Sequence, residues 1–388
     1  TVELSVDLDD WETFQRNAKH DGYLAVAYNA ADFGAAWNVP TEPVESPTAI
    51  AANDESVFFN VNTSNGRIQT RAVNPDDAAL QWSVDLGPGF YRGAPSVRDG
   101  RVISASMDTS SVSLPIQLLN EETGQLLGTV QYASQFAVPG AIVQFDGAFY
   151  LQSGYYGNVV FAGNSANATE AWQVEPNPPG TGFVMEGQSV AADEDFVYYY
   201  GISGLYVLDR TNGTTARFIA DPFFAAAGIS YRGSYYAAPI LTDTNLAIAF
   251  SGNKSPRQAL PLNAYDLSDG SFSWRTGSTY VGTPALRDGL LYAIRADTRF
   301  VDAINIETGA VVSTFDLSGS STENLLSNII ITESHMFVGS LTETFAIDLV
   351  DAGNPVVWNV PHGGDLAITP TNQLVITAPD GLFAYNLF

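Results

Sequence analysis

The chain has 388 residues, no cysteine, and 42 acidic against 16 basic side chains, which gives a formal net charge of −26. The lack of cysteine excludes disulfides, thiolate metal sites and cysteine nucleophiles, and so large a negative charge disfavours binding to DNA or RNA. No apolar run approaches the length of a membrane-spanning helix. The excess of acid and the scarcity of lysine favour an extracytoplasmic setting.

Residues 1–23 precede the repeats that fill the rest of the chain, and we treat them as an N-terminal lead-in segment. Their first ten residues alternate apolar and polar side chains like a strand. We interpret these ten residues either as the end of an upstream module or as a strand laid on the outside of the domain. Residues 24–388 contain no linker or low-complexity tract, so we expect one closed domain there.

A repeated unit organises residues 24–388. Each unit opens with a short apolar strand, as in Gly93–Gly100 and Gly282–Gly289, and continues with a second apolar or aromatic strand. A third strand ends in an Asp/Asn-x-x-x-Gly turn, as in Asn120–Gly124, Asp209–Gly213, Asp266–Gly270 and Asn305–Gly309. The first residue of such a turn accepts hydrogen bonds from the turn amides, and the glycine supplies the positive φ of a bulged hairpin.

Tryptophans give the period of the repeat. Trp37, Trp82, Trp172, Trp274 and Trp358 stand in closing strands, and their spacing corresponds to units of about 46 residues. That length suits a four-stranded propeller blade. In units without tryptophan, we place Leu127, Phe218 and Phe315 at the matching position.

Counting the units predicts an all-β, eight-bladed β-propeller. The first seven blades are expected at residues 46–86, 93–132, 139–176, 187–222, 237–277, 282–319 and 324–361. The eighth begins at Gly364 and has only three strands before the chain ends, while an unassigned strand lies at Phe33–Val39. Pairing this N-terminal strand with the C-terminal blade would close the ring and remove its exposed edges.

Two stretches carry a resemblance to a known family. The segment Gly282–Phe315 matches the family repeat, and Trp11–Tyr23 follows the pattern Trp-x-x-Phe-x-x-Asn-x-x-His-x-Gly. Both resemble the PQQ-like repeat propellers, in which the second pattern precedes the blades of many bacterial members. The resemblance covers nearly the whole chain and implies the propeller fold.

The branches of that family differ in activity. Quinoprotein dehydrogenases hold PQQ and a calcium ion on the propeller axis, commonly with an adjacent Cys-Cys pair that this chain lacks. Other branches resemble the noncatalytic scaffold lipoprotein of the bacterial outer-membrane assembly machine, or bacterial surface propellers. The resemblance implies a noncatalytic binding or scaffold propeller that is periplasmic, outer-membrane-associated or secreted. The alternative is a PQQ-dependent dehydrogenase or a carbohydrate-active propeller enzyme.

Residue types that carry catalysis form no recognisable constellation in the sequence. His20, His335 and His362 are the three histidines, and none has a partner at metal-ligand spacing. No nucleophile elbow, phosphate loop or dinucleotide motif stands in a suitable context. We therefore predict no catalytic residue, no metal site and no cofactor, with PQQ and calcium as the alternative.

The loops on one face are the best candidate for a binding surface. In a propeller with this strand order, the loops between blades share a face with those between second and third strands. Here they are rich in aromatic and basic side chains, which commonly carry recognition. We predict that a protein, an acidic peptide or an anionic oligosaccharide binds there, to Tyr91, Arg92, Glu186, Tyr231, Arg232, Tyr235, Tyr236, Tyr280 and Arg295. Alternatively, the aromatic rings fill the space between blades and the arginines pair with nearby acids.

Overall fold

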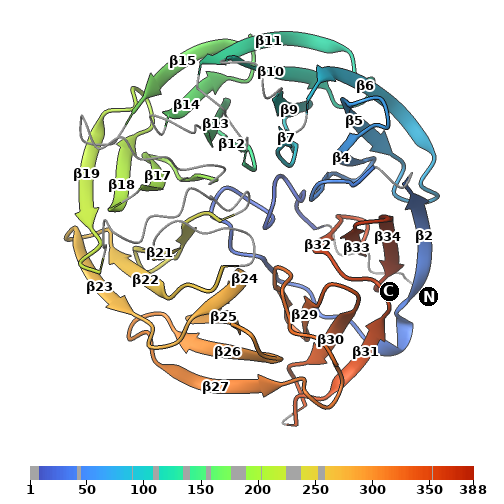
Figure 1. Ribbon diagram of the computed structural model, residues 1–388, viewed down its shortest axis with the longest axis vertical. Helices are drawn as coiled ribbons and strands as arrows, with labels where there is room; N and C mark the ends of the chain where they lie inside the picture. The colour runs from blue at the N-terminus through green and yellow to red at the C-terminus, as the bar shows by residue number, and fades with distance from the viewer. Residues whose placement is uncertain are drawn as a thin grey trace.

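The computed structural model describes residues 8–41, 45–89, 91–107, 113–133, 140–153, 159–175, 189–201, 203–223, 237–251, 258–351 and 353–388. Eight sheets radiate from a common axis (Figure 1), which confirms the predicted eight-bladed propeller. No helix of this described part is long and apolar enough to cross a membrane.

The first four blades follow one another along the chain. Blade 1 consists of β3 (Ala51–Ala52), β4 (Val57–Asn62), β5 (Arg67–Val73) and β6 (Leu80–Pro88). Blade 2 consists of β7 (Tyr91–Arg92), β8 (Ser96–Arg98), β9 (Arg101–Met107), β10 (Ser113–Asn120) and β11 (Leu126–Ala133). Blade 3 consists of β12 (Val143–Phe145), β13 (Ala148–Ser153), β14 (Val159–Asn164) and β15 (Thr169–Val174). Blade 4 consists of β16 (Ala191–Ala192), β17 (Phe196–Gly201), β18 (Gly204–Asp209) and β19 (Thr215–Ala220).

The remaining blades complete the ring. Blade 5 consists of β20 (Ile240–Leu241), β21 (Leu246–Phe250), β22 (Leu262–Asp266) and β23 (Ser271–Arg275). Blade 6 consists of β24 (Tyr280–Arg287), β25 (Leu290–Arg295), β26 (Phe300–Asn305) and β27 (Val311–Asp316). Blade 7 consists of β28 (Ile330–Thr332), β29 (His335–Gly339), β30 (Thr344–Asp348) and β31 (Val356–Val360), with β1 (Tyr23–Leu24) beside β28. Blade 8 consists of β32 (Asp365–Ile368), β33 (Gln373–Ala378), β34 (Gly381–Asn386) and β2 (Gly34–Pro40), and a 3-10 turn at Ala30–Asp32 precedes β2.

The ring closes as predicted. β2 pairs antiparallel with β34, from Gly34 opposite Asn386 to Pro40 opposite Gly381. In Figure 1 the blue β2 lies beside the dark red β34 at the outer edge of blade 8. The outermost strand of this blade therefore comes from one end of the described chain and the other three from the opposite end.

Each tryptophan of a closing strand was expected in an equivalent place, and four of them bind the next blade in the same way. The indole N–H of Trp82 donates to Glu121 O (2.8 Å), that of Trp172 to Arg210 O (2.9 Å), that of Trp274 to Ile306 O (2.6 Å) and that of Trp37 to Pro75 O (2.5 Å). These acceptors lie in or near the third-strand turn of the following blade. Three of the rings cover the glycine that ends that turn, namely Gly124, Gly213 and Gly309.

The matching positions predicted for blades 2, 4 and 6 are wrong. Strand pairing places Gly128, Arg217 and Ser313 where the other blades have tryptophan, instead of Leu127, Phe218 and Phe315. A β-bulge just after each turn shifts the register by one residue, so the tryptophan position lies four residues after the turn glycine. Arg217 fills the place of the indole: it lies against Gly270 and donates to Leu267 O.

The faces of the propeller differ in the loops that they carry. We call lower the face with the hairpin turns that join the first and second strands and the third and fourth strands. We call upper the opposite face, which carries the loops between blades and the loops between second and third strands. Among the predicted binding residues, Tyr280 and Arg295 have described side chains and belong to the upper face by this definition.

From residue 8 onward, the lead-in segment runs through the centre of the ring (Figure 1) and not along its outside. Six blades each donate one inner-strand N–H to it, and these bonds run from Ala52, Val97, Ala192, Leu241, Leu286 and Ile331 to the carbonyls of Trp11, Glu12, Ala18, Lys19, Asp21 and Gly22, at 2.7–3.0 Å. Blade 3 is reached by the Thr13 hydroxyl, which donates to Ile142 O (2.7 Å). The donors lie near the lower-face ends of their strands, so the segment fills the axis on that side. Residues 1–7 lie outside the described part.

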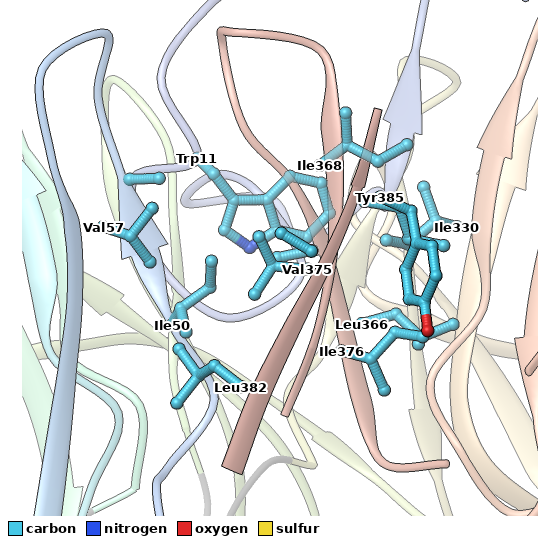
Figure 2. Packing of buried hydrophobic residues seen from close by; sticks show 14 of the residues in the cluster. Trp11, Ile50, Val57, Ile330, Leu366, Ile368, Val375, Ile376, Leu382 and Tyr385 are labelled. Atoms are coloured by element: carbon cyan, nitrogen blue, oxygen red, sulfur yellow. The ribbon is translucent and has the colours of Figure 1, made fainter. Parts of the chain in front are cut away.

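Side chains of the lead-in motif are buried in the axis. Figure 2 shows Trp11 packed among Ile50 and Val57 of blade 1 and Ile368 and Val375 of blade 8. The Gln15 amide donates to Pro284 O (2.9 Å) and Ile329 O (2.7 Å) and accepts from the Asn328 amide (2.8 Å). His20 is fully enclosed, with its ring nitrogens 2.8 Å from Phe14 O and Val190 O, and burial lowers its pKa.

We predict that Trp37→Ala lowers the free energy of unfolding by about 3–5 kcal/mol, because a large buried side chain is lost from the strand that closes the ring. Denaturation in urea measures the loss. Asn38→Ala, an exposed position of the same strand, is the control and should change stability by less than about 0.5 kcal/mol. A Trp37→Ala protein in which blade 8 unfolds in a separate, earlier transition would contradict closure by this strand.

We also predict that Gln15→Leu destabilises the protein by about 3 kcal/mol, because two buried carbonyls and one N–H of the buried Asn328 amide lose their Gln15 partner. Lys19→Ala tests the same segment without that loss: its ammonium pairs with the exposed Asp243 carboxylate (3.1 Å), and the change should cost less than about 1 kcal/mol. Equal losses for the two variants in urea denaturation would show that the Gln15 contacts do not anchor the segment.

Candidate functional site

Two of the nine side chains predicted to bind a ligand lie within the described part of the chain. The backbones of Tyr91 and Arg92 form β7, which pairs with β9, but their side chains lie outside the description. Tyr280 begins β24 and Arg295 ends β25, so both reach the upper face of blade 6. The other five, Glu186, Tyr231, Arg232, Tyr235 and Tyr236, lie in segments that the structure does not describe.

The structure brings Tyr280 and Arg295 together at Asp302, a fully buried carboxylate of β26. Arg295 donates from Nε to Oδ2 (2.9 Å) and from Nη2 to Oδ1 (2.5 Å), and the Tyr280 hydroxyl donates to Oδ2 (3.1 Å). The Thr314 hydroxyl donates to Oδ1 (2.7 Å). Hydrogen bonding to Asp302 raises the pKa of Arg295, and burial together with the Asp302 charge raises the pKa of Tyr280. A ligand that takes Arg295 must therefore compete with a carboxylate of the same blade.

A second buried carboxylate lies where blade 4 leads into blade 5. Asp221 follows β19, and its Oδ2 accepts from the hydroxyl of Tyr200 (2.8 Å), the hydroxyl of Ser251 (2.9 Å) and the amide of Asn263 (2.8 Å). Its Oδ1 accepts from the backbone N–H of Phe223 (2.8 Å). All of these donors are neutral, and they come from both blades. We call this group of side chains the Asp221 cluster.

Sequence reasoning missed both buried carboxylates. Each is a single acid outside a turn, so neither the turn pattern nor a paired-acid pattern marks it. One signal was available in the repeat: Asn263 and Asp302 each stand three residues before the Asp or Asn that starts the third-strand turn. A polar residue at the same buried strand position of neighbouring blades indicates an internal polar network.

The described residues do not fit a quinone cofactor held with a calcium ion, as in the dehydrogenase branch. No group of three or more histidine or acidic side chains is placed to hold a metal ion in the part of the chain that the structure describes. Calcium in proteins takes six to eight oxygen ligands, commonly from several carboxylates. Here Asp302 is bonded to Arg295, and Asp221 stands as a single acid among neutral donors.

A cavity of about 490 Å³ opens on the lower face, between the lead-in and blades 2 and 3. Asp10, Arg98 and Phe145 stand in its wall. Arg98 is paired with Glu12 (2.8 Å). Burial, followed by the charges of Asp54 and Asp9, raises the pKa of Asp10 to about 6. The ionised form of Asp10 is thus disfavoured in the folded protein.

We predict that Asp10→Asn raises the midpoint of thermal unfolding near pH 7.5 and that this gain disappears towards pH 4. The folded-state pKa of Asp10 lies above its ordinary value of 3.8, so the protonated form stabilises the fold at low pH and that contribution is lost as the pH rises through about 6. Asp76→Asn, in an exposed turn, removes the same charge and serves as the control. A gain for Asp10→Asn that is independent of pH would contradict the assignment.

Comparison with solved structures supports the fold and leaves the activity open. The chain matches BamB from Moraxella catarrhalis with a TM-score of 0.64 at 12% identity, over 91% of this chain and 97% of that one. It matches a europium-containing methanol dehydrogenase with a TM-score of 0.73 at 10% identity, over 97% and 98%. A quinohemoprotein alcohol dehydrogenase from Comamonas testosteroni gives 0.55 at 13% identity, over 99% and 81%. At such identities the likeness shows the propeller fold alone.

Sequence comparison identifies the family. No curated protein matches the chain. The profile of the family described as outer membrane protein assembly factor BamB matches residues 20–312, which include the end of the lead-in and most of the blades. The resemblance carried by the repeats and by the lead-in is thereby confirmed, and the chain belongs to the BamB family of PQQ-like repeat propellers.

Proposed function

We propose that this chain is a noncatalytic, extracytoplasmic scaffold propeller that binds a partner on its upper face. The observation that carries the proposal is the family match over residues 20–312, because the family is described as an assembly factor. A protein of that kind acts by holding other chains in place. The closed ring suits this role, since eight sheets fixed edge to edge give a rigid surface with many loops.

The polar groups of the upper face support binding rather than catalysis. Asp302 and Asp221 are both surrounded by donors of their own chain. A general acid or base instead needs a carboxyl group within hydrogen-bond reach of a substrate. The two carboxylates therefore act as anchors that hold neighbouring strands and loops in place.

The partner that we propose for the upper face is a protein, and the ligand chemistry is anionic. Tyr91, Arg92, Tyr231, Arg232 and their neighbours combine aromatic rings with guanidinium groups on a chain of formal charge −26. Guanidinium groups bind carboxylate and sulfate in a bidentate manner. An acidic peptide segment of a partner protein is the first probe, and a sulfated oligosaccharide is the second.

The alternative function is an enzyme, either a PQQ-dependent dehydrogenase or a carbohydrate-active propeller. The similarity to solved dehydrogenases favours the first of these, and PQQ with calcium tests it directly. Cofactor absorbance that depends on calcium, together with dye reduction in the presence of alcohols or sugars, would overturn the scaffold proposal. Release of sugar from a polysaccharide panel would do the same.

We predict that Arg92→Ala and Arg232→Ala each weaken binding of an acidic peptide about tenfold at low salt, since each removes a charge-assisted contact. Fluorescence anisotropy at low and high salt measures the loss, which should shrink as salt rises. The melting temperature should change little.

Arg295→Ala is the matched control. It leaves the buried Asp302 carboxylate without its cation, so it should cost about 3 kcal/mol of stability. If Arg92→Ala and Arg232→Ala lower the melting temperature as Arg295→Ala does and leave the peptide affinity unchanged, these arginines are internal anchors and the proposed surface is wrong.

A further inference from the structure

Blades 5 and 6 place polar side chains at equivalent positions on their upper halves. In blade 5, Leu246 pairs with Asp266 and Ala249 with Asn263; in blade 6, Leu290 pairs with Asn305 and Ala293 with Asp302. The two blades therefore share one register, in which Asn263 corresponds to Asp302. Counting two residues beyond the paired alanines makes Ser251 the equivalent of Arg295.

The two equivalent sites differ in charge balance. In blade 6, the buried carboxylate of Asp302 and the guanidinium of Arg295 neutralise each other. In blade 5, the carboxylate comes from Asp221 instead, and serine stands where blade 6 has arginine. Among the described residues Asp221 takes part in no ion pair. Burying a carboxylate with neutral donors alone is costly.

An amide oxygen in the same cluster lacks a partner. Asn263 is fully buried and uses its N–H groups on Asp221 (2.8 Å) and on the Tyr265 hydroxyl (3.1 Å). Its Oδ1 is buried and accepts no hydrogen bond in the described part of the chain. The same Asn263 side chain thus carries an acceptor without a partner and bonds to a carboxylate that has no ion pair among the described residues. Together, these two groups favour a positive charge at this place.

Arg275 of β23 lies directly opposite Asn263 of β22. Its charge lies over the Phe223 ring, 4.4 Å from the ring centre. A cation–π contact holds it there, on the outer side of the cluster. Arg275 thus does not take the position that Arg295 has in blade 6.

We propose that the Asp221 cluster binds one small cation, at the position that corresponds to the Arg295 guanidinium of blade 6. Asn263 Oδ1 and Asp221 Oδ1 are the oxygens that would meet it, and the hydroxyls of Ser251 and Tyr200 stand beside them. The candidate cations are a metal ion and ammonium. The bound cation would link Asp221, which follows the last strand of blade 4, to Asn263 of β22 in blade 5.

The test uses thermal unfolding of the whole protein at constant ionic strength, in which choline is replaced by sodium, potassium, ammonium or calcium. Choline supplies the screening that an acidic protein requires and is larger than each of the four ions tested. At least one of the four ions should raise the melting temperature of the natural sequence by about 2 °C. The ion that does so also distinguishes a metal ion from ammonium.

Two variants localise the effect. Asp221→Asn keeps the shape and removes the charge, so its melting temperature should no longer respond to the ion. Ser251→Arg introduces the guanidinium of blade 6, so it should raise the melting temperature in choline and also abolish the response. The second variant keeps the test decisive if the first folds poorly.

Other results would overturn the proposal. One is an equal response to ions in the natural protein and in both variants, which would show general screening of the surface. Another is a melting-temperature response that persists in Ser251→Arg but is lost when one basic side chain is neutralised, which would show that the protein itself supplies the neutralising charge. The variants for this comparison are Arg275→Gln, Lys254→Gln, Arg257→Gln and Arg232→Gln. A cluster filled by a water molecule alone would give no response to any of the four ions.

Discussion

An indole laid on the turn of the next blade is the contact on which the ring depends. A Cβ atom at Gly124 would lie 2.7 Å from the Trp82 ring, so the turn must end in glycine for the indole to settle on it. The same residue has a positive φ of 68°, which the hairpin requires as well. One glycine thus serves the fold of its own blade and the docking of the preceding one. Four of the eight blades dock on the next blade in this way, so the contact recurs around the circle.

The lead-in solves a second problem that a ring of sheets creates. The inner strand of each blade has an edge that faces the axis, and six of these edges donate an N–H to the segment between Trp11 and Gly22. Unpaired groups in that buried space would each cost free energy. The segment leaves the upper face to the loops, and both buried carboxylates lie on that side. The structure therefore separates the side that the lead-in fills from the side that carries these loops.

The sequence predicted those features that local patterns encode. The turn glycines and tryptophans revealed the eight blades, and the missing fourth strand after Gly364 revealed the closure. The positions predicted in blades 2, 4 and 6 were wrong because Leu127, Phe218 and Phe315 were chosen as large apolar residues. A β-bulge instead fixes the tryptophan position at four residues after the turn glycine. The path of the lead-in was not predictable, since Gln15 contacts Pro284 and Ile329, hundreds of residues away. Asp221 and Asp302 acquire their meaning only from neighbours that folding assembles.

The central position of the lead-in has a consequence for the order of events during synthesis. Residues 8–24 leave the ribosome before any blade, yet their partners extend from Ala52 to Ile331. Their docking site is therefore complete only when most of the chain has been made. β2 waits longer still, because its partner β34 is the last strand of the propeller. The lead-in must stay unpaired while the blades form one by one, so it is synthesised before the blades and yet is among the last parts of the domain to reach its native contacts.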